Sequence, residues 1–418
     1  MRAMRIAVIG AGISGLVSAY LLSRSHDVTV FEAGTRVGGH TNTVDVQLGG
    51  TVHHVDTGFI VFNRPNYPLF VRLLEQLDVA VQSTDMSFSV QSEADGLEWC
   101  GSGAGGFFAQ RKNLLRPAHW RLLREILRFN RAAPQLLAEE EGSFTLREYL
   151  AREGYSQALS DLYIVPMASA LWSADPRTVL DFPAHYFVRF FDNHGFFKLQ
   201  GRPEWLAIKG GSQRYVEKLT ARFRDRIRTR TPVRQIRRDD AGVEVETDAY
   251  GRERFSAAVL TVHSDQALRM LADATEAERD VLGAIPYQPN EAVLHTDTRV
   301  MPRSRRAWSS WTYHVPAGTS PTSTVTYDMN RLQSLPADPP FFVTLNRTAG
   351  IDPARILRTI QYHHPVYTPA TRAAQQRWDE INGVRHTWYG GAYWGWGFHE
   401  DGVRSAVRIG AQFGEVLG

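Results

Sequence analysis

The first 32 residues contain the pattern that most restricts how this chain can fold. Ile6–Ile9 is a short apolar run, as expected for a buried strand of a parallel sheet. Gly10, Gly12 and Gly15 follow in the spacing G-x-G-x-x-G, and a helical periodicity continues through Leu16–Leu22. The first glycine permits a tight turn, the second lets the backbone approach a pyrophosphate, and the third lets the helix pack closely on the strand. This order predicts a βαβ unit that binds a dinucleotide.

A second strand and an acidic residue complete this unit. Val28–Phe31 reads as the second strand, and Glu32 and Ala33 follow it. Glu32 lies about 20 residues after the glycines, where a carboxylate can bind the two hydroxyls of a ribose. Ser14 lies at the expected N-terminus of the helix, where free N–H groups and the helix dipole favour phosphate. We therefore expect Ser14, Glu32 and Ala33 to contact the cofactor together with the three glycines.

Gly101, Gly103 and Gly106 repeat the glycine spacing without its context. No apolar strand precedes them, and an arginine-rich segment with a proline follows. We interpret 101–106 as a flexible loop, because the fingerprint requires a strand before it and a helix after it.

The residues after Glu32 distinguish FAD from NAD. Arg36, Gly38, Gly39 and His40 form the motif R-x-G-G-H, which resembles the glutathione-reductase-like flavoproteins, in particular their amine oxidase and phytoene desaturase branch. In those proteins the motif wraps the FAD pyrophosphate. The resemblance implies the same role here, with FAD as the cofactor.

Longer motifs across the chain resemble one bacterial family of NAD/FAD-binding or FAD-dependent oxidoreductase proteins. That family is similar to the flavoprotein-like N-terminal part of plant cyclopropane-fatty-acid synthases, and it is often linked with genes for cyclopropane or methyl-branched lipids. The resemblance implies that Thr57 and Gly58 lie beside the cofactor. The motifs are Asp56–Asn63, Phe108–Pro117, Phe190–Phe197, Gly210–Val216, His263–Leu268 and Gly391–Gly402.

The C-terminal motif is expected to complete the flavin site. Arg385–Tyr389 reads as a strand that ends at Gly391, and Asp401–Ser405 reads as the start of the final helix. In similar flavoproteins the N-terminus of this helix points at the flavin N1–O2 edge. This placement implies that Gly402 and Val403 contact the flavin through their backbone.

Val233 follows Thr231-Pro232, and in similar proteins this pattern offers backbone groups to the adenine. The alternative is a buried strand valine with no contact to the cofactor.

The cofactor motifs lie at both ends and in the middle of the chain, which predicts two interleaved units. The expected fold class is α/β, with a glutathione-reductase-like FAD-binding Rossmann domain and an interleaved α+β substrate domain, as in amine oxidases. In the second part of the substrate domain we expect strands at Glu291–His295, Ala307–Val315, Ser323–Tyr327 and Phe341–Leu345. The predicted FAD-binding domain comprises 1–65, 201–262 and 376–418, and the predicted substrate domain comprises 66–200 and 263–375.

The composition agrees with a soluble enzyme. The 418 residues are 43% hydrophobic and 22% charged, which is typical of a folded chain with a large core. A net charge of +3 gives no argument for nucleic acid. Cys100 is the only cysteine, which suits a reducing cytoplasm. The longest apolar stretch is shorter than 18 residues, and the paired histidines lack the spacing of metal ligands, so we predict no membrane span and no metal site.

Aromatic residues gather beside the last motif, at Trp388, Tyr389, Tyr393, Trp394, Trp396 and Phe398. They could form a cage that binds an amine by cation–π attraction, an apolar wall for a hydrocarbon chain, or core packing. Phe398 is the position most similar to a cage aromatic of amine oxidases. The lysines Lys198 and Lys209 have no recognisable place over the flavin, which weakens the amine interpretation.

His399 and Glu400 precede the expected final helix and are candidates for proton transfer during desaturation or isomerisation. Together with Phe398 they form the predicted catalytic set. The alternative is that acidic residues here cap the helix, and Asp401 fits that role by position.

The segment 119–131 is amphipathic and basic. Trp120 and Leu127 are assigned to its apolar side with Leu123 and Ile126, and four arginines to the other side. One interpretation is contact with an anionic membrane, and the other is a cap helix with a solvated polar face.

Taken together, the residues and the resemblance predict an FAD-dependent oxidoreductase that acts on an apolar substrate. The expected reaction is oxidation, desaturation or isomerisation of a lipid acyl chain by hydride transfer to flavin N5. The alternatives are a flavin amine oxidase and a non-catalytic flavoprotein partner of a lipid-modifying methyltransferase. A cytoplasmic protein, with peripheral contact at the inner membrane face, is the corresponding expectation for localisation.

Overall fold

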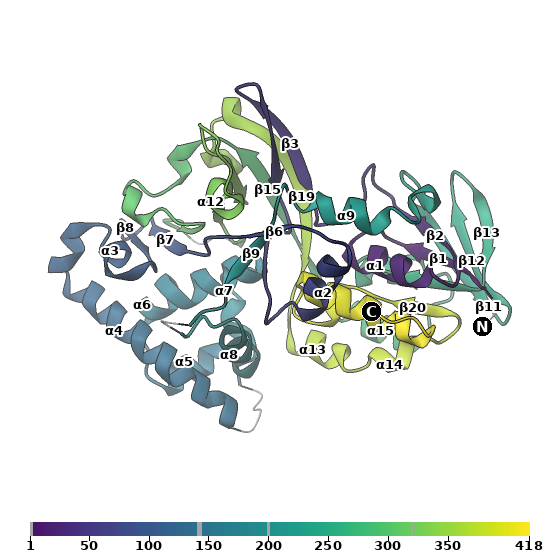
Figure 1. The fold of residues 1–418 in the computed structure, drawn as a ribbon. Coiled ribbons are helices and arrows are strands. Elements are labelled where there is room, and N and C mark those ends of the chain that lie inside the picture. Colours follow the sequence, from purple (N-terminus) through teal and green to yellow (C-terminus); the bar gives the residue numbers. More distant parts are fainter. Residues whose placement is uncertain (1–2, 140–143, 199–200, 319–320) are drawn as a thin grey trace.

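The computed structural model describes residues 3–139, 144–198, 201–318 and 321–418. A parallel sheet of five strands lies at one end of the molecule, in the order β10-β2-β1-β14-β20 (Figure 1). Its strands come from distant parts of the chain, and all neighbouring pairs run parallel. The bounds are β1 Arg5–Ile9, β2 Asp27–Phe31, β10 Ile227–Arg228, β14 Ala257–Leu260 and β20 Thr387–Tyr389.

The two faces of this sheet bury alternate residues of β1, because successive side chains of a strand point to opposite faces. Ile6 and Val8 pack with helices α1, α9 and α15 in one core cluster. Ala7 and Ile9 pack on the other side, with the antiparallel sheet β11-β12-β13 and helices α10 and α11. The bounds are α1 Ile13–Leu22, α9 Gln213–Thr220, α15 His399–Gln412, α10 Ser264–Met270, α11 Glu276–Gly283, β11 Val233–Asp239, β12 Gly242–Thr247 and β13 Gly251–Phe255.

A buried ion pair joins the elements of the second face. The Arg238 side chain is fully buried, and its Nη2 donates to Glu278 Oε2 at 2.8 Å. The Tyr389 hydroxyl donates to Glu278 Oε1 at 2.5 Å. Since Arg238, Glu278 and Tyr389 lie on β11, α11 and β20, the pair fixes all three elements together.

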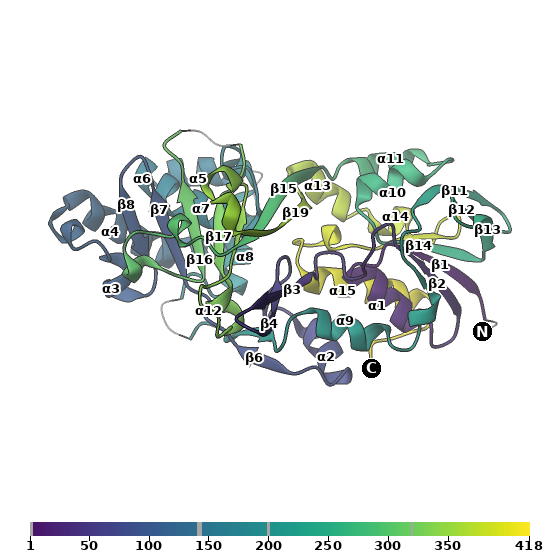
Figure 2. The same cartoon turned by 90° about the horizontal axis from the view of Figure 1, so that it is seen from above.

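A seven-stranded sheet lies at the other end of the molecule, in the order β19-β15-β18-β17-β16-β7-β8 (Figure 2). The four strands expected in 263–375 are confirmed, with β16 starting four residues later than expected. Helices α4, α5, α7 and α8 share one core cluster with Val90 of β7 and with Leu97 and Trp99 of β8. The bounds are β7 Phe88–Ser92, β8 Leu97–Cys100, β15 Tyr287–His295, β16 Trp311–Val315, β17 Val325–Asp328, β18 Phe342–Leu345, β19 Ile356–Pro365, α4 Pro117–Ala132, α5 Leu146–Arg152, α7 Val165–Trp172 and α8 Ala184–Asn193.

Two small antiparallel sheets lie between these ends: the hairpin β3-β4 and the sheet β5-β9-β6. Helix α2 comes from the segment predicted for the substrate domain, yet its residues Phe70 and Leu73 share the core cluster of α1. Helices α10, α11 and α13 pack against the parallel sheet in the same way. The bounds are β3 Thr43–Leu48, β4 Thr51–Asp56, β5 Val61–Asn63, β6 Val81–Ser83, β9 Trp205–Ile208, α2 Pro68–Gln76 and α13 Pro369–Gln375.

The segment expected as a flexible loop at 101–106 is instead a short helix, α3 Gly103–Phe107. A Cβ on Gly106 would lie 2.9 Å from the carbonyl oxygen of Cys100, so this glycine permits close packing of α3 on β8. The remaining helices are α6 Gln157–Leu159, α12 Met329–Gln333 and α14 Trp378–Ile381. Within the described residues, no helix is both long and apolar enough to span a bilayer.

Candidate functional site

A single cavity of about 550 Å³ extends from the carboxyl ends of the parallel strands toward the seven-stranded sheet. Its lining residues come from Ile9 at the N-terminus to His399 near the C-terminus. Ligands of open parallel sheets bind at this carboxyl edge, because the strand-to-helix turns open there. The cavity is therefore the candidate site, and its two ends differ in chemistry.

The glycine turn forms the polar end of the cavity, as predicted from the sequence. Gly10, Gly12 and Ser14 line it, and Gly10 has a φ of +100° that favours glycine. A Cβ on Gly12 would meet no atom within 4 Å, so this glycine leaves open space beside the N-terminus of α1. Gly15 lies behind the turn, where a Cβ would overlap the Gly10 carbonyl oxygen at 1.9 Å. Gly12 thus leaves room for a ligand, and Gly15 permits close packing of α1 against the turn.

Glu32, Ala33 and Val233 lie at the outer part of the same end. Glu32 Oε2 accepts a hydrogen bond from the Ala11 N–H at 2.9 Å, and its Oε1 accepts one from the Gly34 N–H at 2.7 Å. Each carboxylate oxygen keeps a second lone pair, so the group can still bind ribose hydroxyls.

The loop Arg36–His40 packs against the glycine turn. The Gly38 N–H donates to the Ala11 carbonyl at 2.7 Å, and a Cβ on Gly39 would lie 3.0 Å from the Gly12 Cα. Gly38, Gly39 and His40 line the cavity. Arg36 does not line it: its guanidinium donates to the carbonyls of Gly39 and Thr41 at 2.7 and 2.9 Å. In the structure Arg36 therefore holds the shape of the loop from behind, in contrast to the ligand contact expected from the resemblance.

Thr57 and Gly58 extend the polar wall beyond His40. A Cβ on Gly58 would lie 2.2 Å from the His40 carbonyl oxygen, so a larger residue could not let the two loops meet. Gly391 lines the wall from the C-terminal side, and its N–H donates to Ser405 Oγ at 2.9 Å.

Helix α15 begins at His399, two residues earlier than the sequence pattern suggested. This shift changes the roles of Gly402 and Val403, neither of which lines the cavity. The Gly402 N–H already donates to the Phe398 carbonyl at 3.2 Å, and a Cβ on Gly402 would lie 2.7 Å from Ile13 Cγ2. The expected backbone contacts to flavin are therefore not available at these two residues. Gly402 instead allows α15 to pack closely on α1.

Asp401 caps this helix, as its position predicted. Its Oδ2 accepts hydrogen bonds from the N–H groups of Trp396 and Phe398 at 2.9 and 3.1 Å. Burial raises the pKa of Asp401 to about 6. Glu400 has a similar structural role: it accepts from the N–H groups of Leu69 and Phe70, at the start of α2, and does not line the cavity. The geometry thus removes Glu400 from the groups that can reach a substrate in the cavity.

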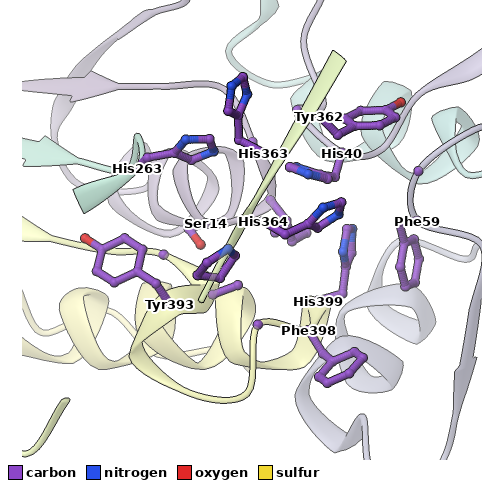
Figure 3. Close-up of a pocket in the computed structure, with 18 of the residues that line it drawn as sticks. Ser14, His40, Phe59, His263, Tyr362, His363, His364, Tyr393, Phe398 and His399 are labelled. Atoms are coloured by element: carbon purple, nitrogen blue, oxygen red, sulfur yellow. The ribbon is translucent and has the colours of Figure 1, made fainter. Parts of the chain in front are cut away.

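His399 and Phe398 do line the cavity, from neighbouring positions (Figure 3). The His399 ring stacks on Phe59 with centroids 3.6 Å apart, and its Nε2 lies 3.0 Å from both the Thr41 and Tyr215 hydroxyl oxygens. Burial lowers the pKa of His399 to about 3. The ring is therefore neutral at physiological pH and is a weak proton acceptor.

Five further histidines line the same cavity: His40, which the sequence motif predicted, and His194, His263, His363 and His364, which no sequence spacing brings together. Figure 3 shows His40, His263, His363 and His364 around the cavity. Burial lowers the pKa of His263 and His364 to about 4 and places that of His40 well below its usual range. Nε2 of His40 is buried and has no hydrogen-bond partner among the described residues. Neutral imidazoles can donate or accept one hydrogen bond without adding charge. Within the described residues, no group of acidic, cysteine or histidine side chains could hold a metal ion.

The far end of the cavity is apolar. Phe190 and Phe398 stack there with centroids 5.1 Å apart, and Trp396 stacks on Tyr186 at 4.0 Å. The apolar lining includes Met86, Leu171, Trp172, Phe190, Trp205, Trp311, Leu345, Trp396 and Phe398. Among the described residues that line the cavity, Glu32 at the opposite end is the only carboxylate, and neither Lys198 nor Lys209 is present.

Asp56 lies outside the cavity despite its place in a motif near the cofactor. It is fully buried, its carboxylate accepts from the Ser212 N–H and hydroxyl at 2.9 and 2.8 Å, and burial raises its pKa to about 6. Asp56 therefore fixes β4 to the start of α9.

The polar end of the cavity fits FAD. It offers a helix N-terminus, a turn that a Cβ at position 12 would fill, an acidic strand end, and an unpaired imidazole nitrogen at His40. Such a site at the edge of a parallel sheet, with α/β connections, defines a Rossmann-type dinucleotide-binding protein.

A comparison with known protein families identifies the family of this chain. The profile of the family described as flavin containing amine oxidoreductase matches residues 13–339, so the chain belongs to this family and its cofactor is FAD. The carotenoid phi-ring synthase of Streptomyces griseus is 29% identical over 316 residues, which are 70% of this chain and 57% of that protein. The chain thus matches little more than half the length of this relative.

Solved structures confirm the predicted fold class. The crystal structure of a fatty acid isomerase from P. acnes that produces CLA superposes with a TM-score of 0.71 at 17% identity, over 99% of both chains. A triple mutant of putrescine oxidase gives the same TM-score at 14% identity, over 98% of both chains. Since a lipid enzyme and an amine enzyme superpose on this chain with the same TM-score, the fold alone does not identify the substrate class.

Proposed function

We propose that the protein is an FAD-dependent oxidoreductase that acts on an apolar substrate, by oxidation, desaturation or isomerisation of a lipid acyl chain. The observation that carries this proposal is the uncharged aromatic and aliphatic end of the cavity, continuous with the FAD-binding end. A hydrocarbon chain buried there gains about 25 cal/mol for each Å² removed from water, and it needs no polar partner.

The bound flavin would accept a hydride from a substrate C–H bond. The chain's own residues would orient that bond and exclude water. Phe398 and Phe190 would hold the acyl chain, and His399 would stay neutral and keep its place through Phe59, Tyr215 and Thr41. We propose that Phe398 and His399 touch the flavin or the substrate, and that Glu400 acts only through the position of α2.

A flavin amine oxidase is the second candidate, because Phe398 and Trp396 could hold a cation. The electrostatics of the aromatic end disfavour it. The Arg372 guanidinium already lies 5.6 Å from the Tyr186 ring centroid and 6.0 Å from that of Trp396. A protonated amine against the same rings would meet a like charge and would find no carboxylate at that end.

The interleaved division of the chain and its partners also belong to this proposal. The packing of α2, α10, α11 and α13 supports adding these helices to the FAD-binding unit. A lipid-modifying methyltransferase partner, suggested by the resemblance to cyclopropane-fatty-acid synthases, would act on the same lipid. A non-catalytic role beside that partner is the alternative of another class. Peripheral contact at the inner face of a membrane would bring the protein to its substrate.

The test is an anaerobic titration of the purified yellow protein, in which flavin absorbance is followed while products are analysed by mass spectrometry. One arm receives unsaturated fatty acids and bacterial phospholipids, and the other receives putrescine and cyclohexylamine. Bleaching or product formation with lipids alone supports the proposal, and product formation without bleaching identifies isomerisation. Bleaching by amines alone refutes it, and no reaction in either arm favours the non-catalytic role. Phe398→Ala should lower lipid turnover while FAD is retained, and Tyr250→Ala, at an exposed ring on another surface, is the matched control.

A further inference from the structure

The 3-10 turn Arg111–Leu115 and helix α4 lie at the end of the molecule farthest from the parallel sheet (Figures 1 and 2). Their exposed side chains are apolar and basic. We call the exposed side chains of residues 111–131 the tip surface. It takes no part in the cavity, and none of its residues lines the site.

The exposed face of α4 differs from the face expected from the sequence pattern. The buried face consists of His119, Leu122, Ile126 and Phe129. Trp120 and Leu127, which were assigned to the apolar side with Ile126, are 46% and 44% exposed. Positions 120, 124, 127 and 131 follow the helical spacing of one face, so these two apolar residues alternate there with Arg124 and Arg131.

The preceding turn adds two more apolar side chains. Leu115 is 89% exposed and Leu114 is 48% exposed. Nε1 of Trp120 donates to the Leu114 carbonyl at 2.9 Å, and the Trp120 ring lies 4.7 Å from that of Phe108. Among the described residues, the tip surface therefore holds four of the nine large apolar side chains that are exposed. Such a concentration requires an explanation, because scattered single residues are the normal case.

The charge of the segment is equally concentrated. Residues 111–131 contain seven lysines and arginines and one acid, Glu125, a net charge of +6, whereas the whole chain carries +3. No described carboxylate forms an ion pair with any of the seven. Of the seven, only the Arg128 side chain has partners among the described residues: it donates to the carbonyls of Glu153 and Gly154 and lies 4.0 Å over the Tyr155 ring. Among the described residues, the other basic side chains of the segment have no hydrogen-bond or ion-pair partner, so they can bind an anionic partner.

We propose that the tip surface docks on an anionic lipid bilayer, with Leu114, Leu115, Trp120 and Leu127 inserted among the acyl chains and the basic side chains on the headgroups. Protruding apolar residues flanked by cations match the layered chemistry of a membrane interface. An acidic protein would pair with the basic side chains of the tip surface. It would not offer one continuous apolar environment in which all the protruding leucines could be buried. The contact would not depend on which substrate the flavin site takes.

The experiment is flotation of the full-length, FAD-loaded protein with vesicles. One set is phosphatidylcholine alone, and the other contains about one third phosphatidylglycerol. We expect binding only to the anionic set, with binding weakened by salt. Failure of the wild-type protein to float with anionic vesicles at low salt overturns the proposal.

Two variants separate charge from insertion. Lys112→Gln/Arg124→Gln/Arg131→Gln should weaken binding about 5-fold for each charge, roughly 100-fold in all. Its control is Arg72→Gln/Arg222→Gln/Arg358→Gln, which removes three exposed charges elsewhere and should leave binding within a few fold. Equal losses in both variants would mean that net charge alone attracts the protein, which refutes a specific surface.

The second variant is Leu115→Ser/Leu127→Ser, which should weaken binding at least about tenfold without a change of charge. Its control is Leu357→Ser/Val416→Ser, at two apolar side chains that are 43% and 62% exposed on other surfaces. Unchanged binding of the first pair overturns the insertion of apolar side chains. Retention of FAD and an unchanged melting temperature verify that each variant is folded.

Discussion

The two glycines of the fingerprint that differ most in their surroundings provide a decisive experiment. Gly12 has a φ of −77° and a ψ of −177°, which any residue can adopt, and its Cβ would meet nothing within 4 Å. Gly15 lies inside α1, and its Cβ would lie 1.9 Å from the Gly10 carbonyl oxygen and 2.5 Å from Thr261 Oγ1. The substitutions Gly12→Val and Gly15→Ala should therefore fail in opposite ways.

For Gly12→Val we expect a stable apoprotein that no longer retains FAD. The added Cβ points into open space, so the free energy of unfolding of the apoprotein should fall by only about 1 kcal/mol or less, the cost of valine in place of glycine at the N-cap of α1. With the cofactor bound, that space belongs to the pyrophosphate. The overlap should weaken FAD binding by about 3 kcal/mol or more, roughly 100-fold.

For Gly15→Ala we expect a lower stability of the apoprotein itself. An overlap at 1.9 Å with backbone cannot be relieved by a side-chain rotation, so the helix must move. We expect a loss of about 3 kcal/mol or more, which for 418 residues lowers the melting temperature by about 3 °C or more.

The assays are thermal unfolding of the two apoproteins and FAD titration followed by quenching of flavin fluorescence. The reasoning is refuted if apo Gly12→Val melts several degrees below the parent, because its Cβ would then meet atoms that the structure does not place there. It is also refuted if Gly12→Val binds FAD with unchanged affinity, since another part of the cavity would then hold the pyrophosphate.

Three further predictions follow from charged groups. Glu32→Ala should weaken FAD binding by about 1.5–3 kcal/mol through a lost charge-assisted hydrogen bond, and equal affinity in a fluorescence titration would reject its ribose role. Glu278→Gln should lower the free energy of unfolding in urea by about 1.5–3 kcal/mol, because it removes the buried one of the two carboxylates that pair with Arg238 and leaves only Asp273; Asp248→Asn, at an exposed pair, is the control and should cost less than about 1 kcal/mol. The pKa of Asp56 is raised to about 6 in the folded protein, so the folded state binds a proton that the unfolded chain has released between about pH 4 and 6. The stability of the parent relative to Asp56→Asn should therefore fall as pH rises through that window and stay constant above it, and a constant difference in urea unfolding across the window would contradict the raised pKa.

Much of the cofactor half of this protein could be predicted from local sequence, because local sterics determine it. A glycine turn after an apolar strand, a helix, and an acid at the end of the next strand leave few alternatives for the backbone. For this reason Gly10, Gly12, Ser14, Glu32 and the loop that ends at His40 all line the cavity, as expected.

The errors at the C-terminal motif have one local cause. The pattern placed the helix start at Asp401, but the backbone turns into α15 at His399. A shift of two residues rotates side chains by about 200° around a helix axis. Glu400 therefore points to the start of α2, and the Gly402 N–H donates to the Phe398 carbonyl at the start of α15.

The substrate end of the cavity was decided only by the tertiary structure. Leu171, Trp205, Trp311 and Trp396 lie far apart in the sequence, and no spacing rule connects them. The sequence alone established a parallel-sheet nucleotide site, since that depends on short-range backbone geometry. The packing of whole sheets and helices decides which side chains face a common cavity. It also decides which arginines form buried ion pairs and which leucines stay exposed to solvent. This packing is a long-range property of the folded chain.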